Sequence, residues 1–224
     1  YCINMKLNIQ VPQTLNDVTL GQYQKFAKLN TEENNNTNFL LHKMVEIFCN
    51  IDLKDIARIK FTYVQAIINE LNKMFDEKTP LVPTFQLHGV EYGFIPKLDD
   101  ITLGEYIDLD NTLSDWQQMH KAMSVLYRPV TIKKNNRYQV EPYTGDENED
   151  IFLHMPLDVV MGALLFFWNL SNELLQITLN YLSEEMKENL TTQQRQILEQ
   201  SGAGINQFTE SLKGILPNSM KLHD

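Results

Sequence analysis

The sequence has few cysteines and no long apolar run. Its two cysteines, Cys2 and Cys49, lie in no CxxC or other metal-ligand spacing. A chain of 224 residues with 43% hydrophobic content can fill a core without a disulfide, so a reducing compartment is expected. The longest apolar run, Val159 to Trp168, falls well short of the roughly 20 residues that cross a bilayer. The run therefore predicts a buried helix and no membrane span. The start of the sequence has no signal-peptide pattern, so we do not expect secretion by that route.

Positive charge is also scarce. There are 19 Lys and Arg against 29 Asp and Glu, which gives a net charge of −10 and a pI near 5.0. A protein that binds nucleic acid neutralises phosphates with clustered Lys and Arg, whereas an acidic chain repels them. The composition therefore disfavours sequence-specific binding of DNA or RNA.

The common catalytic and cofactor-binding motifs are missing as well. The sequence contains no phosphate loop ending in Gly-Lys-Ser/Thr and no dinucleotide-type glycine triplet. It contains no Gly-x-Ser-x-Gly and no His-Glu-x-x-His, and none of its five histidines shares a metal-binding spacing with another. We therefore expect no catalytic residue, no cofactor and no metal. The sequence favours a protein that binds other protein chains.

Acidic residues near the middle of the chain are the remaining candidates for chemistry. Two carboxylates held close together can act as general acid and general base. Here Asp100 lies beside a predicted helix start and Glu105 belongs to a capping motif, which leaves Asp108, Asp110 and Asp115. An enzyme hypothesis requires these three to converge in a cleft. The alternative is that they lie on the solvated face of a helix.

The most informative pattern is an internal repeat of seven residues. The sequence DVTLGQY at 17–23 returns as DITLGEY at 100–106. In each copy a threonine stands at the N-cap position and a Gln or Glu follows three residues later, which is the capping-box pattern. The repeat therefore predicts helices that begin at Leu20 and Leu103.

Each copy of the repeat follows a segment with a strand pattern. Residues 6–11 (KLNIQV) alternate polar and apolar, and residues 84–95 (TFQLHGVEYGFI) indicate two strands around a His-Gly turn. A strand, a proline and a capped helix thus occur twice, at 6–30 and 85–110. One interpretation is a duplicated strand-loop-helix unit whose helices present equivalent faces. The other is that two unrelated helix starts share one capping solution.

Apolar residues recur at helical spacing through most of the remaining chain. We predict helices at 39–51, 53–59, 63–75, 106–127 with a break near Asn111, and 156 to about 182, and a second hairpin at 130–141. The fold class is therefore α+β and predominantly helical, with capped helices and two small β-hairpins. Residues 1–182 are expected to form the main domain. Residues 183–224 are expected to form a helical C-terminal extension, with helices at 193–200 and 205–216.

Two groups of residues are candidates for contacts with a partner protein, because Trp, Tyr, Met and Arg are enriched at interfaces. The first group lies near the end of the 106–127 helix: Trp116, Met119, Met123, Tyr127 and Arg128. The second group is Phe167 and Trp168, which follow Phe166 and so point in different directions around one helix. A single domain covers all three aromatic rings only if that helix is central. Both groups can equally be core, with Arg128 capping the first.

Three stretches of the sequence resemble proteins of tailed bacteriophages. They are GVEYGFIPKLDDITLGEYIDLDNTLSDWQQMHKAMSVLYRPV at 89–130, RYQVEPYTG at 137–145 and PLDVVMGALLFFWNL at 156–170. The family they resemble comprises structural and assembly proteins of phages that infect Bacteroidetes, including the crAss-like group. The resemblance covers about half the chain and brings no catalytic motif.

This resemblance implies a virion protein without an active site. It implies a ring or connector subunit at the portal, neck or tail, in a homo-oligomeric ring that contacts the portal and neighbouring ring or tail proteins. Such a subunit is assembled in the host cytoplasm, and DNA passes through the channel of its ring. An acidic lumen would suit this role because it repels phosphates. The alternatives are a tail-assembly chaperone that is absent from the mature virion, and a regulatory adaptor of the host.

Overall fold

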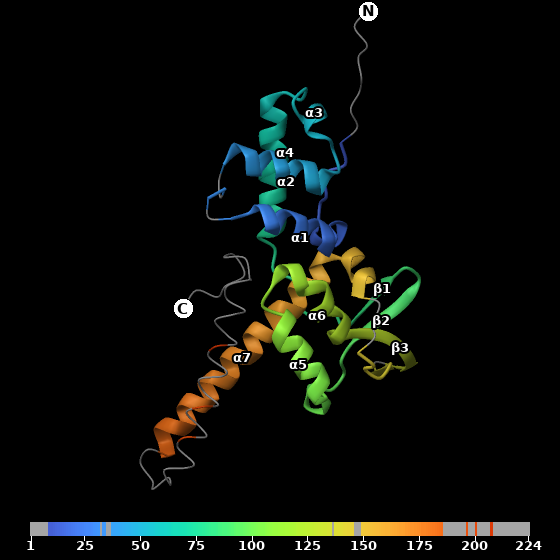
Figure 1. Cartoon of the computed structure of the whole chain (residues 1–224), viewed down its shortest axis with the longest axis vertical. Coiled ribbons are helices and arrows are strands. Elements are labelled where there is room, and N and C mark those ends of the chain that lie inside the picture. The colour runs from blue at the N-terminus through green and yellow to red at the C-terminus, as the bar shows by residue number, and fades with distance from the viewer. Residues whose placement is uncertain are drawn as a thin grey trace, which may run out of the picture.

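The computed structural model describes residues 9–185, except for 32, 35, 36, 136 and 146–148, together with 196, 200 and 207. Helices dominate this part of the chain, and its strands form one small antiparallel sheet. The fold is therefore α+β and predominantly helical, as the sequence predicts. The N-terminal helices lie at one end of the molecule, the sheet lies next to them in the body, and a long helix runs from between the two away from the body (Figure 1).

The N-terminal part is a group of helices that follow one another closely. It comprises the short 3-10 helix η1 (Leu15–Asp17) and helices α1 (Leu20–Leu29), α2 (Asn38–Cys49), α3 (Leu53–Ile56) and α4 (Phe61–Phe75). On α4, the residues with helical spacing are the buried ones, namely Val64, Ile67, Ile68, Leu71 and Met74. The apolar periodicity thus identified these helices, although α3 is a single turn and ends before the predicted boundary.

The strand predicted at 6–11 is not found where the structure describes it. Residues 9–11 form no strand, and residues 6–8 lie outside the described residues. The described sheet is made of other segments, so residues 9–11 have no ladder partner among the described strands. An extended segment becomes a strand only when a neighbour pairs with its backbone groups.

The sheet contains both predicted hairpins and joins them. Its strands are β1 (Thr84–Leu87), β2 (Val90–Phe94), β3 (Tyr127–Lys134) and β4 (Arg137–Val140), in the order β1-β2-β3-β4. The join is the antiparallel pair β2–β3, in which Phe94 lies opposite Tyr127. The helix predicted to reach Tyr127 therefore ends at Leu126, because Tyr127 and Arg128 pair with β2 and Pro129 disfavours helical geometry before it.

The repeated heptapeptide forms two capped helix starts, as predicted. At α1, the Thr19 hydroxyl accepts from the Gln22 backbone N–H at 3.2 Å, and Gln22 Oε1 accepts from the Thr19 N–H at 3.0 Å. At α5 (Leu103–Thr112), Thr102 and Glu105 make the same pair of bonds at 3.3 and 2.7 Å. Each box satisfies two backbone N–H groups that the first helical turn leaves without a partner.

The predicted break in the next helix lies at the end of α5. After Thr112 the chain forms the 3-10 helix η3 (Trp116–Gln118) and then α6 (Met119–Leu126). Asp115 caps η3 by accepting a hydrogen bond from the Gln117 N–H at 2.9 Å. The break turns α6 so that Met119, Met123 and Leu126 are fully buried.

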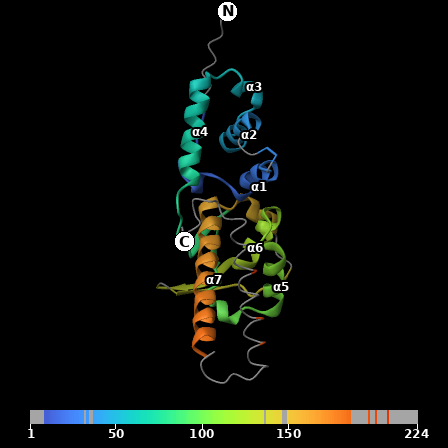
Figure 2. The same cartoon turned by 90° about the vertical axis from the view of Figure 1, so that its left-hand side faces the viewer.

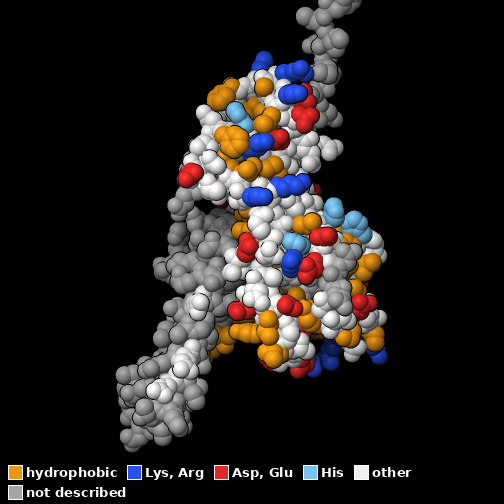
Figure 3. Space-filling model, in the orientation of Figure 1, with side chains coloured by type: hydrophobic (Ala, Val, Ile, Leu, Met, Phe, Trp, Pro, Cys, Tyr) orange, Lys and Arg blue, Asp and Glu red, His pale blue; other side chains and the backbone are white. Residues whose placement is uncertain are grey.

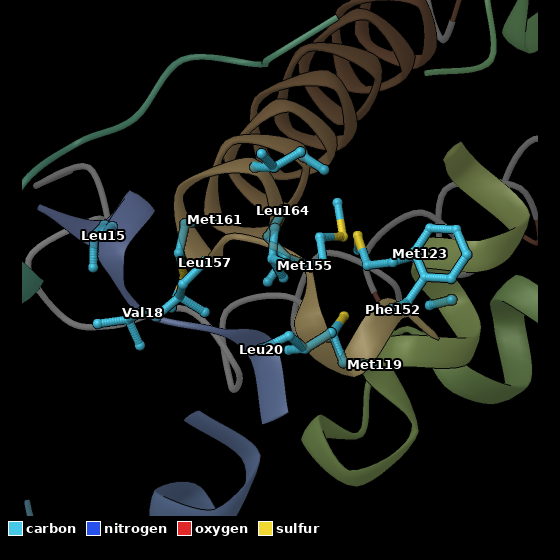
Figure 4. Packing of buried hydrophobic residues seen from close by; sticks show 14 of the residues in the cluster. Leu15, Val18, Leu20, Met119, Met123, Phe152, Met155, Leu157, Met161 and Leu164 are labelled. Atoms are coloured by element: carbon cyan, nitrogen blue, oxygen red, sulfur yellow. The ribbon is translucent and has the colours of Figure 1, made fainter. Parts of the chain in front are cut away.

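The long helix α7 (Leu157–Glu185) begins in the centre of the core. The 3-10 helix η4 (Glu149–His154) leads into it. Residues from η1, the start of α1, α6, η4 and the first turns of α7 converge there (Figure 4). A Cβ on Gly162 would lie 2.2 Å from the Pro80 carbonyl oxygen, so the chain that leads to β1 crosses directly over α7.

The second half of α7 extends beyond the body, and Figure 2 shows the helix running lengthwise below the N-terminal helices. The predicted extension begins within this helix, since α7 continues to Glu185. The helices predicted at 193–200 and 205–216 lie outside the described residues, apart from the helical positions Gln196, Gln200 and Gln207. Among the helices that the structure describes, none is both long enough and apolar enough to span a membrane.

Candidate functional site: two copies of one helix start

The seven candidate interface residues lie in the core or at its edge. Six are buried, and Trp116 is half-buried: Met119 and Met123 are on α6, Tyr127 and Arg128 on β3, Phe167 and Trp168 on α7, and Trp116 on η3. The core alternative therefore describes them. The surface that this chain leaves uncovered lies elsewhere.

Two of these aromatic residues connect the parts of the fold. The Tyr127 hydroxyl donates to the Val82 carbonyl oxygen at 2.9 Å, and burial raises the pKa of this phenol. Trp116 packs against Tyr23 of α1, with ring centroids 4.4 Å apart. Burial likewise raises the pKa of Tyr23, to about 12. Both phenols thus remain neutral and serve packing.

Arg128 forms a buried ion pair with Glu105. Its Nη1 lies 2.9 Å from Glu105 Oε1, and the two side chains are 7% and 4% exposed. The other carboxylate oxygen, Oε2, completes the capping box of α5. Glu105 therefore fixes the start of α5 to strand β3. The sequence identified the capping role but gave no sign of the pairing, because the partner lies 23 positions later.

An open pocket of about 860 Å³ lies beside this ion pair. Its lining combines apolar and cationic side chains: Ile95, Pro96, Lys97, Asp100, Glu105, Arg128, Ile132, Lys134, Arg137, Tyr138, Gln139 and Val140. Lys97 is already paired with Asp100, at 3.5 Å, and Arg128 with Glu105. Lys134 and Arg137 flank the turn of the second hairpin. Their charges make the lining of this pocket positive, although the whole chain is acidic.

The three candidate catalytic carboxylates have separate surroundings. Asp108 accepts a hydrogen bond from the Tyr143 hydroxyl, Asp115 caps η3, and Asp110 is exposed. Within the described residues, no group of three or more His, Cys, Asp or Glu is arranged to hold a metal ion. The rings of His88 and His154 contact each other, with centroids 5.2 Å apart. Asp108 and Asp115 thus make local hydrogen bonds, Asp110 lies on the solvated face of α5, and the three do not share one site.

Comparison of the chain with protein-family models, with curated proteins and with solved structures found no match. The described surface of this chain is therefore the basis for a functional proposal. The most distinctive feature of this surface is that the two copies of the repeat differ in burial.

The first copy is enclosed by the chain itself. Val18 and Leu20 are fully buried, and the Leu20 N–H donates to the Met155 carbonyl oxygen at 2.9 Å. The Leu157 N–H donates to the Val18 carbonyl oxygen at 2.8 Å. These two bonds form an isolated antiparallel bridge centred on Thr19 and Pro156. A short extended segment before α7 thus docks on the start of α1.

The second copy presents the same face to solvent. Leu103, Tyr106 and Ile107 follow the i, i+3, i+4 spacing of one helix face, and they are 75%, 61% and 47% exposed. Figure 3 shows hydrophobic side chains next to acidic ones along the lower edge of the body, where α5 lies. Sequence reasoning missed this surface. The repeat was the available signal, since it predicts two equivalent helix faces. It could not show which of the two faces is buried, because that depends on what packs against each.

Proposed function

We propose that this protein is a non-enzymatic structural subunit of a tailed-phage virion, a ring or connector protein of the portal, neck or tail region. One observation carries the proposal: the described chain leaves large apolar side chains bare on several separate elements. Phe61 on α4 is 74% exposed, Leu103 on α5 is 75% exposed and Ile177 on α7 is 64% exposed. A subunit with several neighbours needs several such surfaces, and a contiguous exposed apolar face such as Leu103, Tyr106 and Ile107 is typical of a protein–protein contact.

The distribution of charge supports the same role. Residues 1–83 contain nine Lys and Arg and nine Asp and Glu, whereas residues 84–224 contain ten and twenty. The whole net charge of −10 therefore belongs to the part of the chain from the sheet onward. In a ring through which DNA passes, that part would face the channel, because a negative wall repels phosphates and leaves the DNA mobile. The resemblance of residues 89–130, 137–145 and 156–170 to phage proteins is the second support.

The experiment that tests this proposal is mass spectrometry of purified phage particles, combined with electron microscopy of the isolated protein. We expect the chain in the virion at a copy number that matches a ring, and rings of the isolated protein at high concentration. Its absence from purified particles would contradict the proposal. Absence together with a stable complex with an unassembled tail protein would identify the alternative, a tail-assembly chaperone.

A further inference from the structure

The internal contact at the start of α1 specifies what the repeated motif binds. Its apolar face meets the segment that leads into α7, and its backbone makes two hydrogen bonds to Met155 and Leu157. Its glycine is also used, since a Cβ on Gly21 would lie 3.0 Å from the Leu153 carbonyl oxygen. Finally, the Asn16 side-chain amide donates to both carboxylate oxygens of Asp158 at 3.2 Å.

The second copy keeps the groups that make this contact, but no described segment pairs with its backbone, and the Tyr143 side chain packs beside it at Gly104. The backbone groups equivalent to those of Val18 and Leu20 are the Ile101 carbonyl and the Leu103 N–H. Neither makes a backbone hydrogen bond to another described residue. The apolar residues Leu103 and Tyr106 are exposed, whereas Leu20 is fully buried. A recognition face is thus present in duplicate, and among the described residues a backbone segment docks on the first copy alone.

Gly104 provides an independent sign of the same face. Glycine is unfavourable inside a helix, so a helical glycine calls for a reason. Gly21 has one, the close approach of Leu153, but the nearest atom to a Cβ on Gly104 would be a ring carbon of Tyr143 at an ordinary 3.7 Å. Within the described chain nothing requires Gly104. A segment docked as Leu153 is docked on Gly21 would require it, with the Tyr143 ring moved aside.

The two copies differ in charge, and this difference defines the segment. Asn16 of the first copy corresponds to Asp99 of the second, in the 3-10 helix η2 (Leu98–Asp100). The Asn16 amide donates to the carboxylate of Asp158. The Asp99 carboxylate at the equivalent position would repel a carboxylate, and it would accept a hydrogen bond from a cationic side chain. One further position on the exposed face changes in the same direction, since Ala27 corresponds to Asp110. The occupant of the second copy therefore carries positive charge.

We propose that the start of α5 is a docking site for an extended apolar segment of another protein, with Lys or Arg at the position that Asp158 has in the internal contact. The segment pairs antiparallel across Thr102, covers Leu103 and Tyr106, and passes over Gly104. Backbone pairing supplies the geometry and the cation opposite Asp99 supplies the specificity. This inference deepens the proposed function by naming a contact surface for a neighbouring virion protein, and it rests on that function.

The test uses the full chain and two fluorescein-labelled peptides that differ at one position. The first copies residues 152–160 (FLHMPLDVV), and the second carries Asp158→Lys (FLHMPLKVV). Fluorescence anisotropy measures the affinity of each. We expect the lysine peptide to bind about tenfold more tightly, which corresponds to the exchange of one repulsive contact for one ion pair.

Variants of the protein separate docking from folding. Asp99→Lys should reverse the preference, so that the natural peptide binds more tightly than the lysine peptide. Gly104→Ala should raise the melting temperature, because alanine is the better helix former, and should weaken the lysine peptide several-fold. Leu103→Asp should abolish binding. The matched control is Phe61→Asp, which changes an equally exposed side chain on α4 and should leave binding unchanged.

Three results would overturn the proposal. One is that the lysine peptide binds with a Kd weaker than about 1 mM, the range of a non-specific contact. Another is that Asp99→Lys leaves the preference between the peptides unaltered. The third is hydrogen-exchange protection of the start of α5 that increases with protein concentration alone, which would make a second copy of this chain the occupant. Peptide binding by a protein that is absent from virions would instead refute the proposed function and leave the docking site standing.

Discussion

The substitution Glu105→Gln isolates the buried ion pair from the helix cap. The first copy of the repeat caps α1 with Gln22, so a glutamine can complete the capping box of α5 as well. What is lost is the negative charge opposite Arg128, which is 6% exposed and whose Nε has no hydrogen-bond partner in the described structure. An uncompensated buried charge costs about 3–5 kcal/mol. With a urea dependence of about 3 kcal/mol per molar, the unfolding midpoint should fall by roughly 1–2 M.

The assay is equilibrium unfolding in urea, followed by circular dichroism. Two variants complete it. The double variant Glu105→Gln with Arg128→Met should recover most of the lost stability, because removal of both charges leaves none buried. Asp100→Asn is the control, since it removes a neighbouring charge whose pair with Lys97 is largely exposed, and its midpoint should equal that of the unchanged protein. If Glu105→Gln lowers the midpoint no more than Asp100→Asn does, the ion pair does not hold α5 to the sheet.

Three further predictions follow from packing and titration. Gly162→Ala should destabilise the fold by about 1–3 kcal/mol in urea unfolding, because its Cβ would overlap a backbone carbonyl; unchanged stability would contradict the close crossing over α7. Burial raises the pKa of the Cys49 thiol to about 11, so in a Cys2→Ser variant a thiol reagent at neutral pH should react only after denaturation, and rapid labelling of the native protein would refute this. Burial lowers the pKa of His120 from 6.5, although Glu149 and Asp150 act against it, and its Nδ1 lies 3.1 Å from Gln24 Nε2. The folded state thus opposes protonation, so stability should fall as the pH drops below about 6.5, and His120→Gln should flatten that part of the urea-midpoint profile.

Local signals in the sequence located most of the secondary structure. The capping boxes predicted the first residues of α1 and α5, since the chemistry that starts a helix lies within four consecutive positions. Both hairpins were predicted from alternation and turn residues, for the same reason. The join between β2 and β3 was not predictable, because its partners are separated by some thirty positions and nothing near Tyr127 indicates which strand it meets.

Whether the candidate residues are buried or exposed could not be predicted from the sequence. Trp, Met and Tyr on and beside α6 have the composition of both an interface and a core, and only their burial distinguishes the two. The exposed face of α5 consists of Leu103, Tyr106 and Ile107, which on composition alone would be expected inside. Exposure is a property of what surrounds a side chain. The repeat became informative only when the surroundings of its two copies could be compared.

The uninterrupted course of α7 has a mechanical consequence. Its first turns are clamped on all sides by the core, including the backbone that crosses Gly162, and the helix continues without a break to Glu185. At about 1.5 Å per residue, the portion beyond Trp168 extends roughly 25 Å from that clamp. Because the first turns are fixed by the core, the direction of the helix axis is fixed as well. A force applied at the far end of α7 therefore acts as a torque on the junction between the N-terminal helices and the sheet.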